Sequence, residues 1–190
     1  MHYNLKTKYY FINKFNTKNL DKLDKLTAVI YRNYSIEKTK ITEILKIKKY
    51  CRKKNIKFFL SNNIKLSINL NLDGVYLPSF NKSLVHLNYS FKKNFILLGS
   101  AHNLKEIRIK ERQKVKEIFL SSLFKDNGNF LGLNKFNLLS NYSKKDVIAL
   151  GGIDNNNLNK LRNTRSFGFA AISYFFKHDN INSLMYKKYE

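Results

Sequence analysis

Eight short apolar runs, separated by longer polar segments, recur along this chain. The runs are nearly continuous rather than alternating, as is typical of strands buried on both faces of a parallel sheet. They span Tyr9–Phe15, Thr27–Arg32, Ile56–Leu60, Asp73–Leu77, Phe95–Gly99, Glu117–Ser121, Val147–Gly151 and Phe167–Ser173. We therefore expect eight parallel strands.

Several intervening segments have the spacing of amphipathic helices. The clearest are Glu37–Lys54, with Ile41, Ile44, Leu45 and Cys51 on one face; Asn103–Lys116, with Leu104, Ile107 and Val115; and Asn155–Arg165, with Leu158 and Leu161. Asn155 is the expected N-cap of the last helix. The segments 62–72 and 130–145 have weaker patterns.

The alternation of strands and helices indicates βαβ units. Eight strands favour an α/β fold of the closed (β/α)8 TIM-barrel type, with an open doubly wound sheet as the rival. The chain of 190 residues is then one small domain over residues 1–190, with its core at about 9–176. In such a barrel, functional residues lie at the carboxyl ends of the strands.

Composition excludes several other classes of protein. Cys51 is the only cysteine, so neither an intramolecular disulfide nor a zinc site with several thiolates can form. No run approaches the roughly 18–20 apolar residues of a membrane span, and the first residues do not resemble a secretory signal. We expect a cytoplasmic protein without membrane association.

The chain is strongly basic, with 36 lysine and arginine residues against 13 acidic ones and a net charge of +23. One interpretation is a polyanionic partner, either nucleic acid or phosphorylated metabolites. The other is the codon bias of an A/T-rich genome, because lysine and asparagine are abundant. Only six of the 36 basic residues are arginine, the residue that nucleic-acid surfaces favour. Nucleic acid is therefore the less favoured partner.

Polar residues or glycines follow the expected strands. Those of interest are Arg32, Ser61–Asn63, Pro78–Asn81, Ser100–His102, Ser121–Ser122, Gly151–Gly152 and Ser173. Arginine at a strand end suits a phosphate group, and a Gly-Gly pair lets backbone N–H groups approach an anion. Loops are polar in any case, so an ordinary tight turn at the glycines is an equal alternative.

His102 is a candidate general acid or base, with an ordinary hydrogen-bonded loop histidine as the plain alternative. Common catalytic and nucleotide-binding motifs are absent from the sequence. They include G-x-G-x-x-G, the P-loop, H-E-x-x-H and G-x-S-x-G. Carboxylates are also scarce at the strand ends, which disfavours a hydrolase built on two acids.

Several of these segments together resemble a known family. They are DGVYLP at 73–78, LGSAHN at 98–103, SSLF at 121–124, ALGGI at 149–153 and GFAAIS at 168–173, with RNY at 32–34 similar to a divergent branch. Their order and spacing resemble the thiamine phosphate synthase and thiazole tautomerase superfamily, over nearly the whole chain. The resemblance implies a TIM barrel.

The resemblance also implies a reaction and a set of site residues. Synthases of this type join a hydroxymethylpyrimidine diphosphate to a thiazole phosphate in thiamine biosynthesis, release pyrophosphate and use Mg²⁺. The partners would therefore be phosphorylated small molecules, and the oligomeric state is left open. The implied catalytic residues are Arg32, Ser100 and His102. The implied substrate-binding residues are Asn62, Lys125, Gly151, Gly152, Ile172 and Ser173, and the implied metal positions are Asn63 and Asn81.

Some positions depart from the family pattern. Asn63 and Asn81 stand where the family has acidic metal ligands, and neutral amides bind Mg²⁺ more weakly. Tyr34 and Tyr76 replace a lysine and a histidine, and only Lys125 can substitute for a missing loop lysine. An impaired synthase is therefore one expectation. The alternatives are a thiazole tautomerase-like isomerase that uses His102 and a non-catalytic barrel that binds a phosphorylated ligand.

Overall fold

The protein forms a closed barrel of eight parallel strands in the order of the sequence, in a computed structural model that describes residues 7–33 and 41–175. The strands are β1 (Thr7–Ile12), β2 (Thr27–Tyr31), β3 (Phe58–Ser61), β4 (Gly74–Leu77), β5 (Ile96–Ala101), β6 (Glu117–Leu120), β7 (Asp146–Leu150) and β8 (Gly168–Ala171). Each overlaps one of the eight predicted runs, and β8 closes onto β1. The predicted TIM barrel is confirmed, and the open sheet is excluded.

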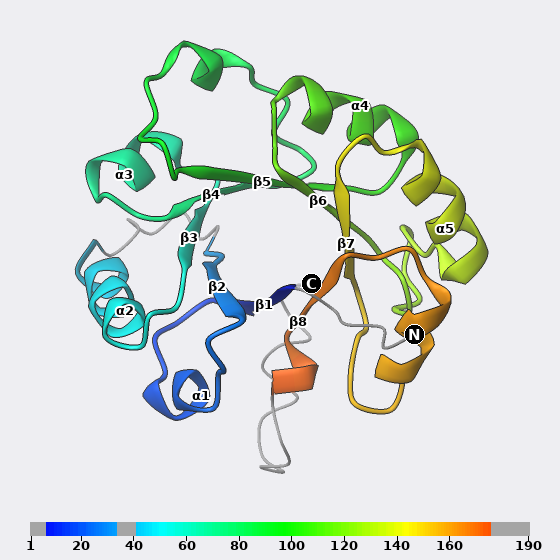
Figure 1. Ribbon diagram of the computed structural model, residues 1–190, viewed down its shortest axis with the longest axis horizontal. Coiled ribbons are helices and arrows are strands. Elements are labelled where there is room, and N and C mark those ends of the chain that lie inside the picture. The colour runs from blue at the N-terminus through cyan, green and yellow to red at the C-terminus, as the bar shows by residue number, and fades with distance from the viewer. Residues whose placement is uncertain (1–6, 34–40, 176–190) are drawn as a thin grey trace.

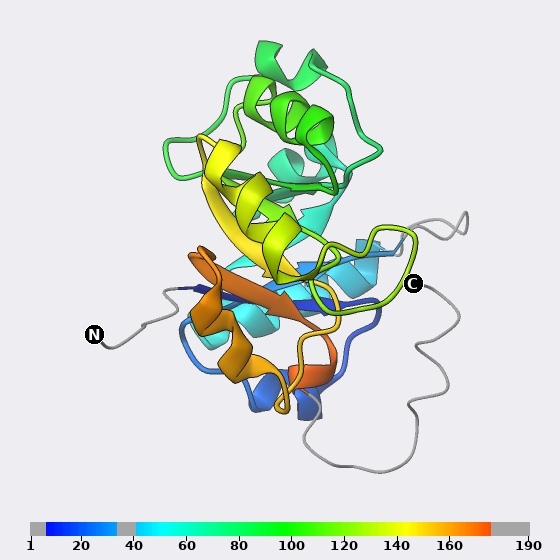
Figure 2. The same ribbon diagram turned by 90° about the vertical axis from the view of Figure 1, so that its right-hand side faces the viewer.

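Helices surround the barrel (Figure 1). They are α1 (Thr17–Asp21), α2 (Ile41–Lys53), α3 (Ile64–Asn69), α4 (Leu104–Arg112) and α5 (Gly132–Tyr142). The described part of the chain also contains three short 3₁₀ helices: η1 (Val85–Asn88), η2 (Leu158–Asn163) and η3 (Ser173–Phe175). In the side view of Figure 2, the strands cross the middle of the molecule between these outer elements.

The barrel interior is filled by apolar and aromatic side chains. One cluster consists of inward-facing strand residues, including Tyr9, Phe11, Phe59, Tyr76 and Phe119. Phe119 packs edge-on against Tyr9 and Tyr76, with ring centroids 4.8 and 5.3 Å apart. Offset and edge-on contacts of this kind are the favoured geometry for aromatic rings. The interior is therefore a packed core rather than a channel.

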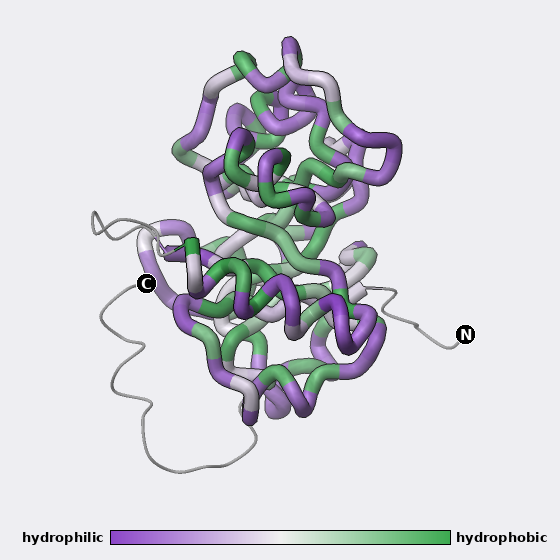
Figure 3. Tube along the Cα trace, turned by 90° about the vertical axis from the view of Figure 1, so that its left-hand side faces the viewer, coloured by the Kyte–Doolittle hydropathy of each residue, from purple (hydrophilic) through white to green (hydrophobic). Residues whose placement is uncertain are grey.

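Two further apolar clusters lie between the strands and the outer helices. Figure 3 shows hydrophobic and hydrophilic residues alternating along the helical segments, with hydrophobic stretches in the middle of the molecule. Alternate strand residues face the interior and the helices, so both faces of the sheet are apolar. This two-sided burial explains why the strands read as continuous apolar runs.

Some predictions about the helices were wrong. Ile41, Leu45 and Leu104 were placed on buried faces but are 50%, 43% and 38% exposed. Ile44 and Cys51 are buried as predicted, and Ile47 completes the buried face of α2. In a chain this rich in lysine, several faces of a helix have similar patterns, and only docking onto the strands decides between them. The predicted start of this helix at Glu37 lies outside the described residues.

The predicted helix over 155–165 is also wrong. Only the 3₁₀ helix η2 forms there, and its N-cap is Asn157 without a side-chain capping bond, not Asn155. The segment has just two apolar anchors, Leu158 and Leu161, three residues apart. That spacing matches the period of a 3₁₀ helix. Conversely, the weak patterns at 62–72 and 130–145 do contain helices, α3 and α5.

Candidate functional site

The carboxyl ends of all eight strands lie at one end of the barrel, because every strand pair is parallel. The predicted site residues therefore lie on or next to one rim. The positions are Arg32 after β2, Asn62 and Asn63 after β3, Asn81 after β4, Ser100 and His102 at β5, Lys125 after β6, Gly151 and Gly152 after β7, and Ile172 and Ser173 after β8. The fold thus brings together residues that are up to 141 positions apart.

A ring of polar side chains forms the last layer of the barrel interior at this rim. Phe59, Leu98 and Phe119 face inward. Side chains two residues further along a strand point to the same face, which places Ser61, Ser100 and Ser121 in the next layer. All three serines are buried. The change from largely aromatic side chains to hydroxyl groups marks where the apolar core ends and the polar rim begins.

Arg32 contributes the positive charge of this layer. Its guanidinium carbon lies 5.1 Å from the centre of the inward-facing Phe11 ring. Its backbone N–H donates to Ile12 O at 2.7 Å, which continues the β1–β2 pairing beyond the last strand residue. The cation–π contact orients the guanidinium at the mouth of the barrel without using its N–H groups. The arginine can thus present those donors to an anion.

Asn62 and Asn81 are joined by a hydrogen bond across the rim. Asn81 Nδ2 donates to Asn62 Oδ1 at 2.7 Å. Asn62 adopts a left-handed backbone conformation with φ of 57°, which asparagine tolerates better than most residues. Its backbone N–H donates to Tyr76 O at 2.8 Å. The predicted positions after β3 and β4 therefore form one unit.

The loop that carries Asn81 is fixed from below by a buried lysine. Lys110 of α4 is 0% exposed, and its Nζ donates to Pro78 O, Asn81 O and Gln113 Oε1 at 2.7, 2.8 and 2.9 Å. Burial lowers the pKa of Lys110 to about 8, and the nearby charge of Glu106 opposes that shift. Sequence analysis missed this lysine, since one of many lysines on a helix reads as a solvated side chain.

The two implied metal positions do not fit a magnesium ion. Asn63 Oδ1 caps α3 by accepting the Leu66 N–H at 3.0 Å. Asn81 Oδ1 accepts from Ser83 N at 3.0 Å and Gln113 Nε2 at 3.3 Å, and a carbonyl oxygen has only two lone pairs. Within residues 7–33 and 41–175, no cluster of three or more histidine, cysteine or acidic residues has metal-binding geometry. Both amides are neutral and both oxygens already accept hydrogen bonds, so the pair is a poor ligand set for Mg²⁺, which favours carboxylates.

Gly151 and Gly152 bring the loop after β7 against the loop after β6. Both have positive φ, 100° and 72°. A Cβ on Gly151 would lie 2.8 Å from Ser122 Cα, and one on Gly152 would lie 2.6 Å from Lys125 N. The packing therefore requires glycine at both positions. It also places the backbone of Lys125 beside Gly152.

Ile172 and Ser173 follow β8 on the same rim. Ser173 is exposed and begins η3, while Ile172 O accepts the Phe175 N–H at 3.1 Å. Ile172 also packs against the cluster in the barrel interior. The carboxyl ends of β7 and β8 are neighbours in the barrel. Their loops are where TIM barrels often bind phosphate.

His102 is held by the helix that follows it. Its Nδ1 lies 2.9 Å from Glu106 Oε2, and the same oxygen accepts the His102 backbone N–H at 2.8 Å. Asn103 Oδ1 in turn accepts the Glu106 N–H at 3.0 Å, so these residues form a variant of the capping box at the start of α4. This arrangement accounts for His102 without a catalytic role.

Asn13 is a site candidate that sequence analysis overlooked. It follows β1 two residues after the inward-facing Phe11, and its Oδ1 is buried with no hydrogen-bond partner among the described residues. Buried polar atoms are normally satisfied by protein, water or ligand. The signal was present in the sequence, because Tyr9, Phe11 and Asn13 alternate along the first run. Asn13 therefore offers an acceptor at the mouth of the barrel.

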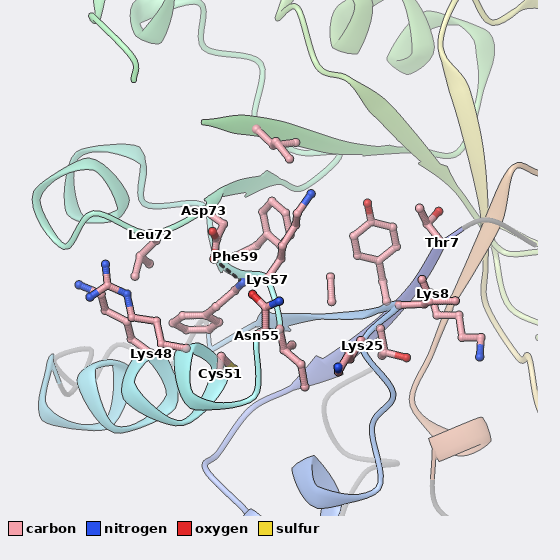
Figure 4. Close-up of a pocket in the computed structure, with 18 of the residues that line it drawn as sticks. Thr7, Lys8, Lys25, Lys48, Cys51, Asn55, Lys57, Phe59, Leu72 and Asp73 are labelled. Atoms are coloured by element: carbon pink, nitrogen blue, oxygen red, sulfur yellow. Dashed lines mark hydrogen bonds between the residues drawn. The ribbon is translucent and has the colours of Figure 1, made fainter. Parts of the chain in front are cut away.

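The opposite end of the barrel contains a cavity of about 510 Å³ (Figure 4). It is lined by residues that precede or begin strands, including Lys57, Asp73 and Glu117. Burial and the neighbouring charges of Arg52 and Lys92 lower the pKa of Lys48 in its wall. In TIM barrels this end contributes to stability rather than to catalysis. The cavity is therefore separate from the predicted site.

No helix within the described ranges is long and apolar enough to cross a bilayer.

Comparison with known proteins supports the family resemblance. A family model described as thiamine monophosphate synthase matches residues 17–175. The thiamine-phosphate synthase of Persephonella marina is 30% identical over 162 residues, which cover 82% of this chain and 77% of that protein. That of Methanococcus vannielii is 26% identical over 152 residues, covering 77% and 73%.

Among solved structures, a thiamine phosphate pyrophosphorylase from Pyrococcus furiosus matches with a TM-score of 0.75 and 22% identity. The match covers 90% of this chain and 87% of that one. FabK from Thermotoga maritima matches with a TM-score of 0.70 at 12% identity, covering 90% of this chain and 59% of the other. These structural likenesses show the shared barrel. The family model, which spans most of the sequence, and the relative from Persephonella marina establish that this chain belongs to the thiamine monophosphate synthase family.

Proposed function

We propose that this protein is a thiamine phosphate synthase-type transferase, which joins a hydroxymethylpyrimidine diphosphate to a thiazole phosphate. The bond between the pyrimidine methylene and the diphosphate oxygen breaks, and the electron pair leaves with pyrophosphate. The thiazole nitrogen then donates its lone pair to the methylene carbon and becomes the positively charged nitrogen of thiamine phosphate. No proton or redox partner is needed.

The observation that carries this proposal is the polar layer at the carboxyl end of the barrel. Arg32 sits over Phe11, and its guanidinium has no hydrogen-bond partner among residues 7–33 and 41–175; buried Ser100 lies in the same layer. Negative charge develops on the leaving diphosphate, and fixed donors that face this charge lower the barrier. We assign Arg32 to the diphosphate, and Ser100 and Asn62 to the pyrimidine or its leaving group.

The loops after β7 and β8 would bind the thiazole phosphate. Gly151 and Gly152 provide a backbone that a phosphate can approach closely, and Lys125 is next to them in space. Ile172 and Ser173 complete this side of the rim. Two phosphorylated substrates on opposite sides of one rim would place the reacting carbon and nitrogen together. Such positioning is a large part of catalysis in a two-substrate reaction.

The test is a turnover assay with both purified precursors, with product thiamine phosphate measured by mass spectrometry. We expect product to form and Arg32→Ala to reduce its rate at least tenfold. Conversion of a thiazole tautomer without use of the pyrimidine would instead support the isomerase. Tight binding of a precursor without any product would support a non-catalytic barrel.

A further inference from the structure

We propose that Asn81 is locked as a hydrogen-bond donor, so that the Asn62–Asn81 amide pair binds the diphosphate directly rather than through a metal ion. The inference rests on the proposed function for the identity of the anion. It depends on a chain of four polar side chains, in which each member fixes the orientation of the next. The chain runs from Lys110 through Gln113 and Asn81 to Asn62.

Lys110 fixes the direction of the hydrogen bonds in this series of side chains. An ammonium group has three N–H bonds and no acceptor. All three are used, on Pro78 O, Asn81 O and Gln113 Oε1. The end of the Gln113 amide that faces Lys110 must therefore be its oxygen. The Gln113 Nε2 group must then face the opposite way.

Gln113 passes this orientation on to Asn81. Its Nε2 reaches Ser83 O at 2.8 Å, Asn81 O at 3.1 Å and Asn81 Oδ1 at 3.3 Å. The Ser83 backbone N–H, which can only donate, approaches Asn81 Oδ1 at 3.0 Å. The Ser83 N–H therefore identifies the Asn81 oxygen, and the longer contact from Gln113 Nε2, which shares two N–H bonds among three acceptors, agrees with this orientation.

Asn81 then presents its Nδ2 group to the rim. That group donates to Asn62 Oδ1 at 2.7 Å, so the orientation of the second amide is fixed as well. Two side-chain amides carry four N–H bonds, and the bond between them uses one. The pair therefore has an excess of N–H donors at the rim, which suits an anion and not a cation.

Burial makes the donor and acceptor orientation of these four side chains costly to reverse. Lys110 and Gln113 are both 0% exposed. Gly99 makes room for the lysine, because a Cβ there would lie 2.8 Å from Lys110 Cδ. Turning either Asn81 or Gln113 would set donor against donor inside the protein, where an unsatisfied polar group is costly. The amide pair therefore keeps its polarity when a ligand binds.

The test compares the binding of inorganic pyrophosphate with and without magnesium, by calorimetry on the full-length protein. With EDTA present, we expect wild-type affinity within about threefold of its value in Mg²⁺. Asn81→Asp keeps an oxygen for Ser83 and Gln113 but removes the donor group. We expect this variant to bind pyrophosphate at least tenfold more weakly in EDTA and to regain affinity in Mg²⁺.

Two further variants separate the donor role from charge and from folding. Asn63→Asp adds the same charge on a neighbouring loop but leaves the amide pair intact, so it should weaken binding in EDTA less than Asn81→Asp. Gln113→Glu keeps the acceptor for Lys110 and removes the donor to Asn81. Gln113 is thus a positioning residue, which acts on the anion only through Asn81. We expect the variant to weaken pyrophosphate binding in EDTA while retaining the wild-type circular dichroism spectrum.

Wild-type protein that binds pyrophosphate only in Mg²⁺ would overturn the inference, as would Asn81→Asp with wild-type affinity in EDTA. Turnover of the two precursors is measured in parallel. Turnover combined with strictly Mg²⁺-dependent pyrophosphate binding would refute the donor pair and leave the proposed function standing. Metal-independent pyrophosphate binding without turnover would refute the proposed function and leave the donor pair standing.

Discussion

Tyr9 donates a hydrogen bond of 2.7 Å to Glu117, 108 residues later in the chain, inside the amino-terminal end of the barrel. Both residues are buried, with exposures of 5% and 3%. Burial raises the pKa of the Glu117 carboxyl above the ordinary value, and it also raises the pKa of Tyr9. The pair therefore holds a carboxyl group in the core, where its charged form is penalised.

We predict that Glu117→Gln stabilises the protein at neutral pH. The amide oxygen still accepts the Tyr9 hydroxyl, and the buried charge is removed, so a gain of about 1 kcal/mol is expected. The raised pKa of Glu117 means that the folded state holds its proton longer than the unfolded state. Wild-type stability therefore falls as pH rises between the two pKa values, and the variant should escape that loss.

Urea unfolding of both proteins from pH 4 to 8 measures this difference. The stability gap between variant and wild type should widen as pH rises. Glu117→Ala is the control, because it leaves the Tyr9 hydroxyl without its partner and should be destabilising throughout. A Gln variant that is no more stable than wild type at pH 7 would contradict the prediction.

Arg32→Ala should weaken the binding of inorganic pyrophosphate at least tenfold, since a charge-assisted contact to an anion is lost. The thermal midpoint should change little, because the contact with Phe11 at a partly exposed site is worth only about 0.5–1 kcal/mol. Isothermal titration of both proteins tests this. Arg165→Ala is a matched control that removes an exposed arginine before β8. Equal losses in the two variants would mean that only net charge matters.

Gly151→Ala should destabilise the protein by more than about 1 kcal/mol. The added Cβ would meet Ser122, and the φ of 100° disfavours any residue with a side chain. Gly128→Ala is the matched control, because nothing lies within 4 Å of a Cβ at that position. Thermal denaturation compares the two variants. Similar midpoints in both would show that the loops after β6 and β7 do not pack as described.

Asn63→Asp should strengthen magnesium binding, because it places a carboxylate where the family resemblance implies an acidic metal ligand. Aspartate is as good an N-cap as asparagine, so α3 should be retained. Titration with Mg²⁺ in the presence of pyrophosphate measures the gain. Asn69→Asp, at the other end of α3, adds the same charge away from the rim. Unchanged metal affinity in the Asn63 variant would remove this position from any metal site.

Much of the fold could be predicted because each buried strand is indicated by its own short stretch of sequence. A strand buried on both faces needs apolar residues at nearly every position. Runs such as Phe58–Leu60 and Val147–Leu150 can therefore be predicted as strands from the sequence. Helix faces were harder to predict. Leu104 and Ile107 both have suitable spacing, but only Ile107 is buried. That choice depends on how α4 docks onto its neighbouring strands.

The sequence alone determined the number and order of the strands, and thereby which residues would follow each of them. It could also show that Asn63 and Asn81 carry no charge. Only the tertiary structure decided which way the amides point, because that polarity passes from Lys110 through Gln113 to Asn81. Hydrogen-bond direction depends on neighbours that are distant in the chain, whereas the burial of a strand can be predicted from its own run of apolar residues.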